Sequence, residues 1–169
     1  TITLTAASDV DNVNDAGSGL SLASDGDVAD PDEDDTLSVS GTLSDEDGCT
    51  GSTCALTYAW SNGATSATIT LGQTDVGDII SVTLTYSDDQ SETNTITLTA
   101  ASDVDNVNDD PSGTVTVTGT AQEDQVLGIA TSLMSDEDGL GTFSYQWNRA
   151  GTAVSGSTSL TYTLGQDDV

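Results

Sequence analysis

Apolar and polar residues alternate with a period of two along most of the chain. Val82, Leu84 and Tyr86 alternate with serine and threonine, and the aromatic residues of segment 143–147 alternate with polar residues in the same way. Because successive side chains of a strand point to opposite faces, this pattern predicts half-buried antiparallel strands. The predicted strands lie near residues 1–7, 18–23, 36–43, 54–61, 66–71, 78–87, 93–101, 113–120, 126–133, 142–149 and 157–164.

The segments between these strands favour an all-β fold. Glycine, asparagine, aspartate and serine fill the gaps, as turns require, and no segment has the period of a convincing amphipathic helix. Short strands that turn every 8–12 residues or so are typical of a β-sandwich with Greek-key topology. Trp60 and Trp147 each fall on a central predicted strand, where an immunoglobulin-like sandwich places its packing tryptophan. We therefore predict immunoglobulin-like or cadherin-like β-sandwich domains.

The sequence repeats itself after about 90 residues. Residues 1–15 and 95–109 both read TITLTAASDVDNVND, and the motif SDEDG occurs at 44–48 and again at 135–139. This period is too long for solenoid repeats, which run about 20–45 residues, but it suits one small all-β domain per repeat.

The repeat predicts how the chain is divided. We expect the last strand and linker of a preceding repeat in residues 1–15, and a complete sandwich with its linker in residues 16–110. A second repeat, in residues 111–169, is expected to stop before its last two strands. We therefore expect the sequence to be a segment of a longer tandem array.

The charge of the chain excludes several classes of function. The 169 residues include 29 aspartates and glutamates, one basic residue (Arg149) and no histidine, which gives a net charge of −28. Nucleic acids and anionic membrane surfaces are bound through lysine and arginine, so neither is an expected partner. No apolar run approaches the roughly 20 residues of a transmembrane helix, so we expect no membrane insertion in this segment. A histidine base, a lysine Schiff base and a histidine-bound zinc are also excluded.

Paired carboxylates leave glycoside hydrolysis as an enzymatic alternative. No tryptophan-lined cleft or unusual insertion accompanies the acidic residues, and nearly verbatim repetition of a domain is typical of a spacer. We therefore expect the protein not to be an enzyme.

The linker resembles that of a known family. The string DVDNVND at 103–109 and the DPSG that follows it resemble the NVNDAP linker of bacterial giant surface adhesins. The segments at 135–147, 159–169 and 80–90 resemble the immunoglobulin-like tandem units of these RTX-type, type I-secreted, calcium-dependent proteins. The first repeat departs from the pattern at Ala16, which replaces the Asp-Pro. The resemblance implies an extracellular location on the bacterial cell surface and a role as an extender that carries a ligand-binding tip.

The acidic linkers and turns are candidate Ca²⁺ sites, because Ca²⁺ takes about six to eight oxygen ligands from carboxylates, amides and carbonyls. The alternative is that they are solvated turns with favourable Asx hydrogen bonding. For the repeated linker we favour Ca²⁺. The candidate ligands are Asp9, Asp11, Asn14, Asp15, Asp45, Asp47, Asp103, Asp105, Asn106, Asn108, Asp109, Glu123, Asp124, Asp136 and Asp138.

Cys49 and Cys54 are the only thiols of the chain. Their spacing is not that of a C-x-x-C redox motif, and two cysteines without histidine make a poor zinc site. A small loop-closing disulfide in an oxidising exterior is the favoured interpretation.

Three functions follow as hypotheses. The first is a Ca²⁺-rigidified extender of a surface adhesin, whose partners are the neighbouring repeats of the same chain. The second is a self-assembling extracellular filament or sheath, in which the predicted strand 1–7 adds to the sheet of another copy. The third is a carbohydrate- or protein-binding module, which would need exposed aromatic residues.

Overall fold

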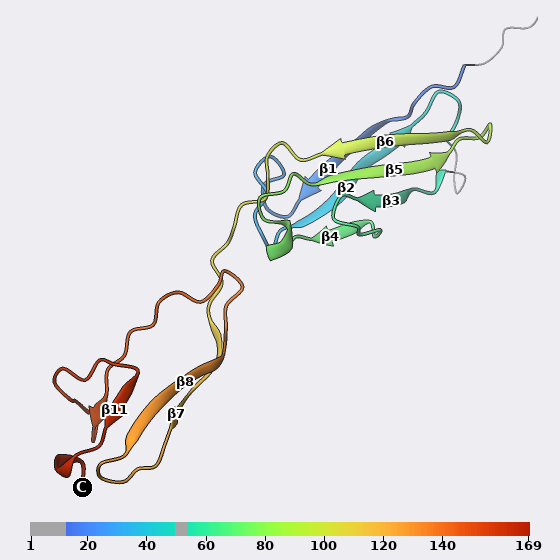
Figure 1. Cartoon of the computed structure of the whole chain (residues 1–169). Coiled ribbons are helices and arrows are strands. Elements are labelled where there is room, and N and C mark those ends of the chain that lie inside the picture. Colours follow the sequence, from blue (N-terminus) through green and yellow to red (C-terminus); the bar gives the residue numbers. More distant parts are fainter. Residues whose placement is uncertain (1–12, 50–53) are drawn as a thin grey trace, which may run out of the picture. The chain divides into compact units, whose positions relative to one another are not determined.

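The computed structural model describes residues 13–49 and 54–169 and confirms the predicted all-β fold. The chain divides into two compact units, residues 1–107 and 108–169, and this division falls inside the predicted linker (Figure 1). Each unit contains antiparallel sheets. In the described residues, no helix has the length and apolar character needed to cross a membrane.

The described residues of unit 1 form two three-stranded antiparallel sheets (Figure 1). The strand predicted at 1–7 lies outside the described residues. The first sheet has the order β1-β2-β4 and contains β1 (Ser18–Ser24), β2 (Thr36–Ser44) and β4 (Thr68–Thr70). The second has the order β3-β5-β6 and contains β3 (Thr57–Trp60), β5 (Ser81–Ser87) and β6 (Thr93–Thr99). The chain therefore changes sheet at each connection from β2 to β5. A 3₁₀ turn, η2 (Gln73–Asp75), follows β4.

Both sheets of unit 1 contribute to a single apolar core. The alternation predicted for β5 is observed, since Val82, Leu84 and Tyr86 are buried while the residues between them are only partly covered. Trp60 is also buried, and its indole N–H donates to the Ser66 carbonyl at 2.9 Å, so its polar atom is satisfied. The core cluster contains Leu37, Trp60, Ile69, Leu71, Ile80, Val82, Leu84 and Val104.

Val104 is the one member of this core that lies in the predicted linker. Its side chain is 2% exposed. The backbone around it forms two parallel β-bridges, Val76–Val104 and Asp32–Asp105, with the loops that follow β4 and precede β2. The first half of the linker is therefore part of the folded unit 1, although its sequence is acidic and turn-like.

Unit 2 repeats one of the two sheets. This sheet has the order β11-β8-β7 and contains β7 (Ser112–Thr118), β8 (Val126–Ser135) and β11 (Thr161–Thr163). The sheet corresponds in sequence order to β1, β2 and β4. The remaining elements are the hairpin of β9 (Asn148–Arg149) and β10 (Thr152–Ala153), and the 3₁₀ turn η3 (Gln166–Asp168). Within the described part of unit 2, no strand corresponds to β5 or β6.

The strand predicted at 142–149 is wrong over most of its length, because only Asn148–Arg149 is a strand there. Its counterpart in unit 1, β3, forms its ladder only with β5. Trp147 forms two backbone hydrogen bonds, with Ser157 and Val154, but residues 142–146 form no backbone hydrogen bond with any described residue that would hold them as a strand. Alternation by itself does not show whether a neighbouring strand is present. The 3₁₀ turns η2 and η3 were not predicted either.

The core of unit 1 makes a direct prediction about stability. Leu84 is fully buried, so Leu84→Ala should lower the free energy of unfolding of unit 1 by about 2–5 kcal/mol, through lost burial and an unfilled cavity. The measurement is urea unfolding followed by Trp60 fluorescence in a Trp147→Phe background. Ile79→Ala is the matched control, because Ile79 is 55% exposed and its loss should stay within about 0.5 kcal/mol. Equal losses in both variants would contradict the core described above.

Candidate metal centre

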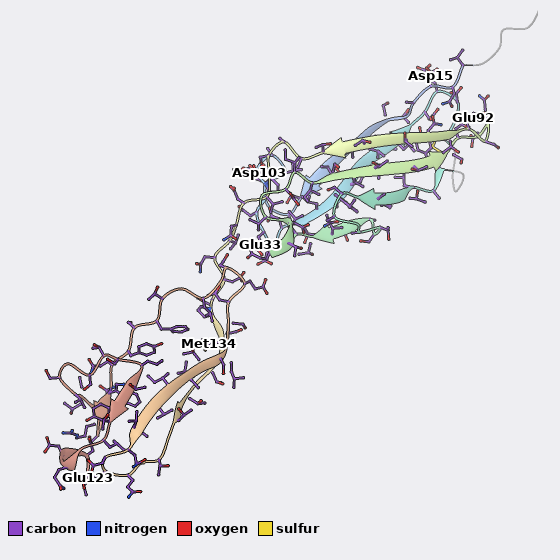
Figure 2. The ribbon with its side chains drawn as sticks, viewed as in Figure 1. Asp15, Glu33, Glu92, Asp103, Glu123 and Met134 are labelled. Carbon is purple, nitrogen blue, oxygen red and sulfur yellow. A yellow bond between two sulfur atoms is a disulfide. The ribbon has the colours of Figure 1, made fainter. Side chains whose placement is uncertain are left out.

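Acidic side chains gather at the two ends of unit 1. Figure 2 shows Asp15 and Glu92 at one end of this unit and Glu33 and Asp103 at the other. We call the first group the apical cluster. It is made of linker residues, the turn after β2 and the β5–β6 hairpin, and its members are Asn14, Asp15, Asp45, Asp47, Asp88 and Asn94.

The turn after β2 is shaped by an Asx hydrogen bond. The Asp47 N–H donates to Asp45 Oδ1 at 2.9 Å, and the Gly48 N–H donates to the Asp45 carbonyl at 3.2 Å. Gly48 has a φ of +96°, which a residue with a side chain adopts only with strain. The sequence SDEDG therefore folds into a turn that holds the carboxylates of Asp45 and Asp47 on the same side as the linker.

The β5–β6 hairpin contributes a buried carboxylate. Asp88 is 4% exposed, and its Oδ1 accepts the N–H groups of Gln90 and Glu92, each at 2.9 Å. The Asn94 amide donates to Asp88 Oδ2 at 3.1 Å and is itself buried. These donors satisfy the carboxylate, which explains how it is kept out of water.

The linker that enters unit 1 is bonded directly to the apical cluster. The Asp15 N–H donates to Asp47 Oδ2 at 2.6 Å, and the Asn14 amide donates to Asn94 Oδ1 at 2.8 Å. The backbone of Asp15 and the side chain of Asn14 are both hydrogen-bonded, so the position at which the chain enters unit 1 is fixed next to the turn after β2.

Tyr86 links the core to this cluster. Its hydroxyl donates to Asp45 Oδ2 and accepts the Gly17 N–H at 2.8 Å. A side chain at position 17 would displace the Tyr86 hydroxyl and Leu43, so glycine preserves this hydrogen bond. Burial, and then the hydrogen bond to Asp45, raise the pKa of Tyr86 to about 12.

Unit 2 builds the same contact between linker and turn. The Asp109 N–H donates to Asp138 Oδ2 at 2.7 Å, and the Asp138 N–H donates to Asp136 Oδ1 at 3.0 Å. Asp109, Asp136 and Asp138 are the repeat counterparts of Asp15, Asp45 and Asp47. A hollow of about 260 Å³ lies beside them, lined by Asp109, Asp110, Ser112, Ser135, Asp136 and Glu137.

The structure separates other predicted ligands from these clusters. Asp103 and Asp105 lie at the opposite end of unit 1 from Asp15, and Asn106 accepts a hydrogen bond from Gln73 at that same end, at 3.0 Å. In unit 2, Glu123 and Asp124 precede β8 whereas Asp136 and Asp138 follow it, so the two acidic turns are at opposite ends of a ten-residue strand.

Two further predicted ligands need separate mention. The Asn108 amide donates to the Asp109 carbonyl at 3.0 Å, which leaves the side-chain oxygen for other contacts. Asp9 and Asp11 lie outside the described residues.

The sequence analysis missed Asp88 and Asn94, which are the most buried polar members of the apical cluster. A signal for Asn94 was present, because it occupies an inward position of β6, in phase with Ile96 and Leu98. A polar residue in an apolar phase indicates a buried hydrogen-bonding group. Asp88 follows β5 in an ordinary turn sequence and gave no such signal.

Arg149, the only basic residue of the chain, forms an ion pair with Asp168 in the 3₁₀ turn η3 of unit 2. Arg149 Nε donates to Asp168 Oδ1 at 2.8 Å, and the Gly165 N–H donates to Asp168 Oδ2 at 2.8 Å. The Gly165 bond, followed by the Arg149 bond, holds the pKa of Asp168 below its ordinary value. In unit 1 the corresponding carboxylate, Asp75, is bonded by Asn62 instead, at 3.2 Å.

Cys49 and Cys54 are joined by a disulfide, with their Cα atoms 5.5 Å apart. The bond ties the end of the turn after β2 to the segment that leads into β3. It therefore lies next to the apical cluster in sequence but contributes no ligand to it.

Comparison with known protein families, curated proteins and solved structures gives no match for this chain. The interpretation of the site therefore depends on its own geometry and chemistry.

The Tyr86 contacts predict a distinct behaviour in alkali. A raised pKa means that this group's contribution to stability is fully present below pH 10 or so and is lost as the pH rises through about 12. Tyr86→Phe should therefore destabilise unit 1 at pH 8, and the difference from the natural protein should shrink between these two pH values. Absorbance at 295 nm should show one late-titrating tyrosine, which disappears in Tyr86→Phe and persists in the control Tyr58→Phe. Ordinary titration of all four tyrosines would contradict the burial of this hydroxyl.

Proposed function

We propose that the chain is a non-enzymatic structural repeat of a long extracellular surface adhesin. In this proposal it acts as a Ca²⁺-rigidified spacer between the bacterial cell surface and a ligand-binding tip. The observation that carries the proposal is a hydrogen bond between linker and turn that occurs in both units. It joins Asp15 to Asp47 in unit 1 and Asp109 to Asp138 in unit 2. A spacer depends on fixed entry and exit points, and this contact fixes the entry in the same way in both units.

The exit from unit 1 supports the same function. Val104 is buried in the core and Asp105 forms a β-bridge, so the chain is held for several residues beyond β6. Asn106 is bonded to unit 1 and Asp109 to unit 2, which leaves two linker residues between these attachments. In this proposal, length and stiffness are the useful properties of the molecule.

The choice of Ca²⁺ is supported by the kind of atoms that the clusters present. Carboxylate and amide oxygens are the ligands that Ca²⁺ prefers, and in each unit a backbone hydrogen bond seats a linker aspartate next to the carboxylates of the turn. The net charge of −28 also favours a bound cation, because it would relieve repulsion among carboxylates. In this proposal Asp45, Asp47 and Asp15 hold the ion in unit 1, and Asp136, Asp138 and Asp109 hold it in unit 2.

A calcium titration tests the proposal. With extracellular-type affinities of about 0.1–1 mM, roughly 5 mM Ca²⁺ should add about 1–2 kcal/mol per site and raise the Tm by several degrees. Small-angle X-ray scattering on the same samples should show a narrower range of molecular dimensions with Ca²⁺ than with a chelator. Identical melting and scattering under both conditions would refute the calcium mechanism, and the carboxylates would then be a salt-adapted surface.

A pair of variants makes this test specific to the apical cluster. Asp47→Asn removes one negative charge but keeps an oxygen that can accept the Asp15 N–H, so it should abolish most of the Ca²⁺-induced rise in the Tm of unit 1. Glu46→Gln removes the same charge from the same turn, yet Glu46 is exposed, so it should leave the rise unchanged. Equal loss in the two variants would point to diffuse charge screening and not to a defined site.

A further inference from the structure

The turn after β3 contains the only Asn-Gly pair of the chain, Asn62-Gly63. The Trp60 N–H donates to the Ala64 carbonyl at 2.9 Å, and the Gly63 N–H donates to the Trp60 carbonyl at 3.0 Å. Asn62 and Gly63 are both exposed, whereas Trp60 is buried in the core. The pair is therefore open to water although it follows directly on the core of unit 1.

The Asn62 side chain is held by two long hydrogen bonds. Its Oδ1 accepts the Ala64 N–H at 3.2 Å, and its Nδ2 donates to Asp75 Oδ1, also at 3.2 Å. Asp75 is 7% exposed, and its other oxygen accepts the Gly72 N–H at 3.1 Å. The Asn62 amide is thus one of the donors that satisfy a buried carboxylate.

An asparagine that precedes glycine can lose its side-chain amide without an enzyme. The Gly63 nitrogen attacks Cγ of Asn62 and forms a succinimide ring, and the former side-chain nitrogen leaves as ammonia with the Gly63 amide proton. Water then opens the ring at either carbonyl, which restores a backbone N–H and leaves aspartate or isoaspartate. Glycine hinders the attack least because it has no Cβ. Space is also available, because a Cβ at Gly63 would meet nothing within 4 Å.

The structure assists one step of this reaction and restrains another. The Ala64 N–H donates to Oδ1 of Asn62, where negative charge develops during the attack, and a donor in that position stabilises the charge. The Gly63 N–H must first leave the Trp60 carbonyl, which breaks one hydrogen bond in an exposed turn. The reaction therefore needs local opening of the turn and not unfolding of unit 1.

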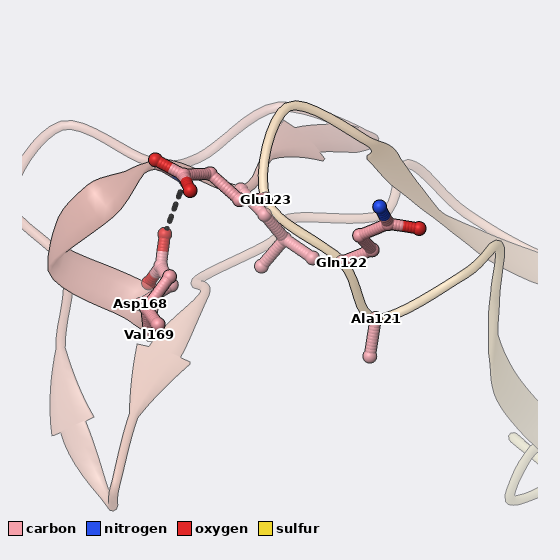
Figure 3. A pocket seen from close by; sticks show the side chains of 7 residues that line it. Ala121, Gln122, Glu123, Asp168 and Val169 are labelled. Carbon is pink, nitrogen blue, oxygen red and sulfur yellow. Dashed lines mark hydrogen bonds between the residues drawn. The ribbon is translucent and has the colours of Figure 1, made fainter.

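Unit 2 places a different donor at this position. Arg149 follows Trp147 by the same number of residues as Asn62 follows the tryptophan of unit 1. Its Nε donates to Asp168 Oδ1 at 2.8 Å. Asp168, the counterpart of Asp75, lies in η3 (Figure 3). Both units supply a donor to this carboxylate, but only in unit 1 is the donor an amide that hydrolysis can remove.

We propose that Asn62 is a site of spontaneous deamidation, and that its modification loosens the hold of unit 1 on the linker that leaves it. Either product carries a carboxylate in place of the amide, so Asp75 loses a donor and gains a like charge beside it. Asp75 ends the 3₁₀ turn η2, and the next residue, Val76, forms the β-bridge to Val104. The chemical change is therefore transmitted to the linker through two consecutive residues.

Peptide mapping of the whole chain during incubation in mildly alkaline buffer tests the chemistry. Chymotrypsin cuts after Trp60 and Leu71 and so isolates residues 61–71, in which Asn62 is the only asparagine. Asn148 is the matched control, because it is also exposed but is followed by arginine. We expect Asn62 to be converted roughly tenfold faster than Asn148 or more, since its neighbour has no Cβ. Equal rates at the two positions would overturn the proposal.

Two variants separate the reaction from its structural effect. Asn62→Asp carries the charge of the product, so its urea midpoint should lie roughly 0.5–1 M below that of the natural chain before any incubation. The natural chain should move toward this value as product accumulates. Asn62→Arg supplies the donor that unit 2 uses, so its midpoint should not change with incubation. The midpoint is followed by Trp60 fluorescence in the Trp147→Phe background, and equal midpoints for Asn62→Asp and the natural chain would contradict the role given to the amide.

Hydrogen exchange tests the effect on the linker. The Gly77 N–H donates to the Val104 carbonyl at 2.9 Å, so its exchange reports on the hold of unit 1 on this segment. Exchange at Gly77 should be several-fold faster in Asn62→Asp than in the natural chain. The Ser91 N–H, which donates to the Asp88 carbonyl in the β5–β6 hairpin, is the control and should keep its rate. An unchanged rate at Gly77 would refute the effect on the linker.

The deamidation does not depend on the proposed function, whereas its consequence for a spacer rests on that proposal. All three measurements are made without Ca²⁺. Their failure is therefore distinct from failure of the calcium mechanism, which is tested by melting and scattering with and without the ion.

Discussion

The structure of unit 1 depends on burying one apolar face of each three-stranded sheet against the other. Each sheet by itself is too small to be stable in water, since a few short strands need a second layer to exclude solvent. Leu37 on one sheet and Val82 and Leu84 on the other are completely buried by this contact. With the faces occupied in this way, the carboxylates of a very acidic chain are confined to the outer surfaces and the two ends.

Unit 2 shows what remains when the second sheet is not present among the described residues. Val117, which pairs with Ile129 in the ladder of β7 and β8, is 64% exposed. Trp147 still donates its indole N–H, here to the Ser159 carbonyl, and it stacks on Tyr162. The local turns and the first sheet therefore form from their own sequence, whereas burial of the apolar face requires strands from elsewhere.

The sequence predicted those features that depend on local alternation. β1, β2, β5, β7 and β8 follow closely from it, because a half-buried strand must place apolar side chains on every second residue. The failures involve long-range partners. Residues 142–146 have the pattern of a strand but form no backbone hydrogen bond with a described residue. Val104 reads as a linker residue because the loops that bury it come from distant parts of the chain.

The candidate site was predictable to a similar extent. The repeated SDEDG motif and the linker aspartates were identified from the sequence, and the structure joins Asp15 with Asp47 and Asp109 with Asp138. The separation of Glu123 from Asp136 also follows from the sequence, because the predicted strand 126–133, observed as β8, lies between these two acidic turns. Asp88 was missed because its burial depends on hairpin donors that a turn sequence does not reveal.

The burial of Val104 changes what counts as one module of this protein. A boundary drawn at the end of β6 would cut away a residue of the core, so the smallest self-contained piece extends through the linker. The identical stretch 95–109 runs across this same boundary, from within β6 to Asp109. A duplication event that copies whole modules must therefore carry the junction together with the domain that precedes it, and recombination between repeats is least disruptive within that shared stretch.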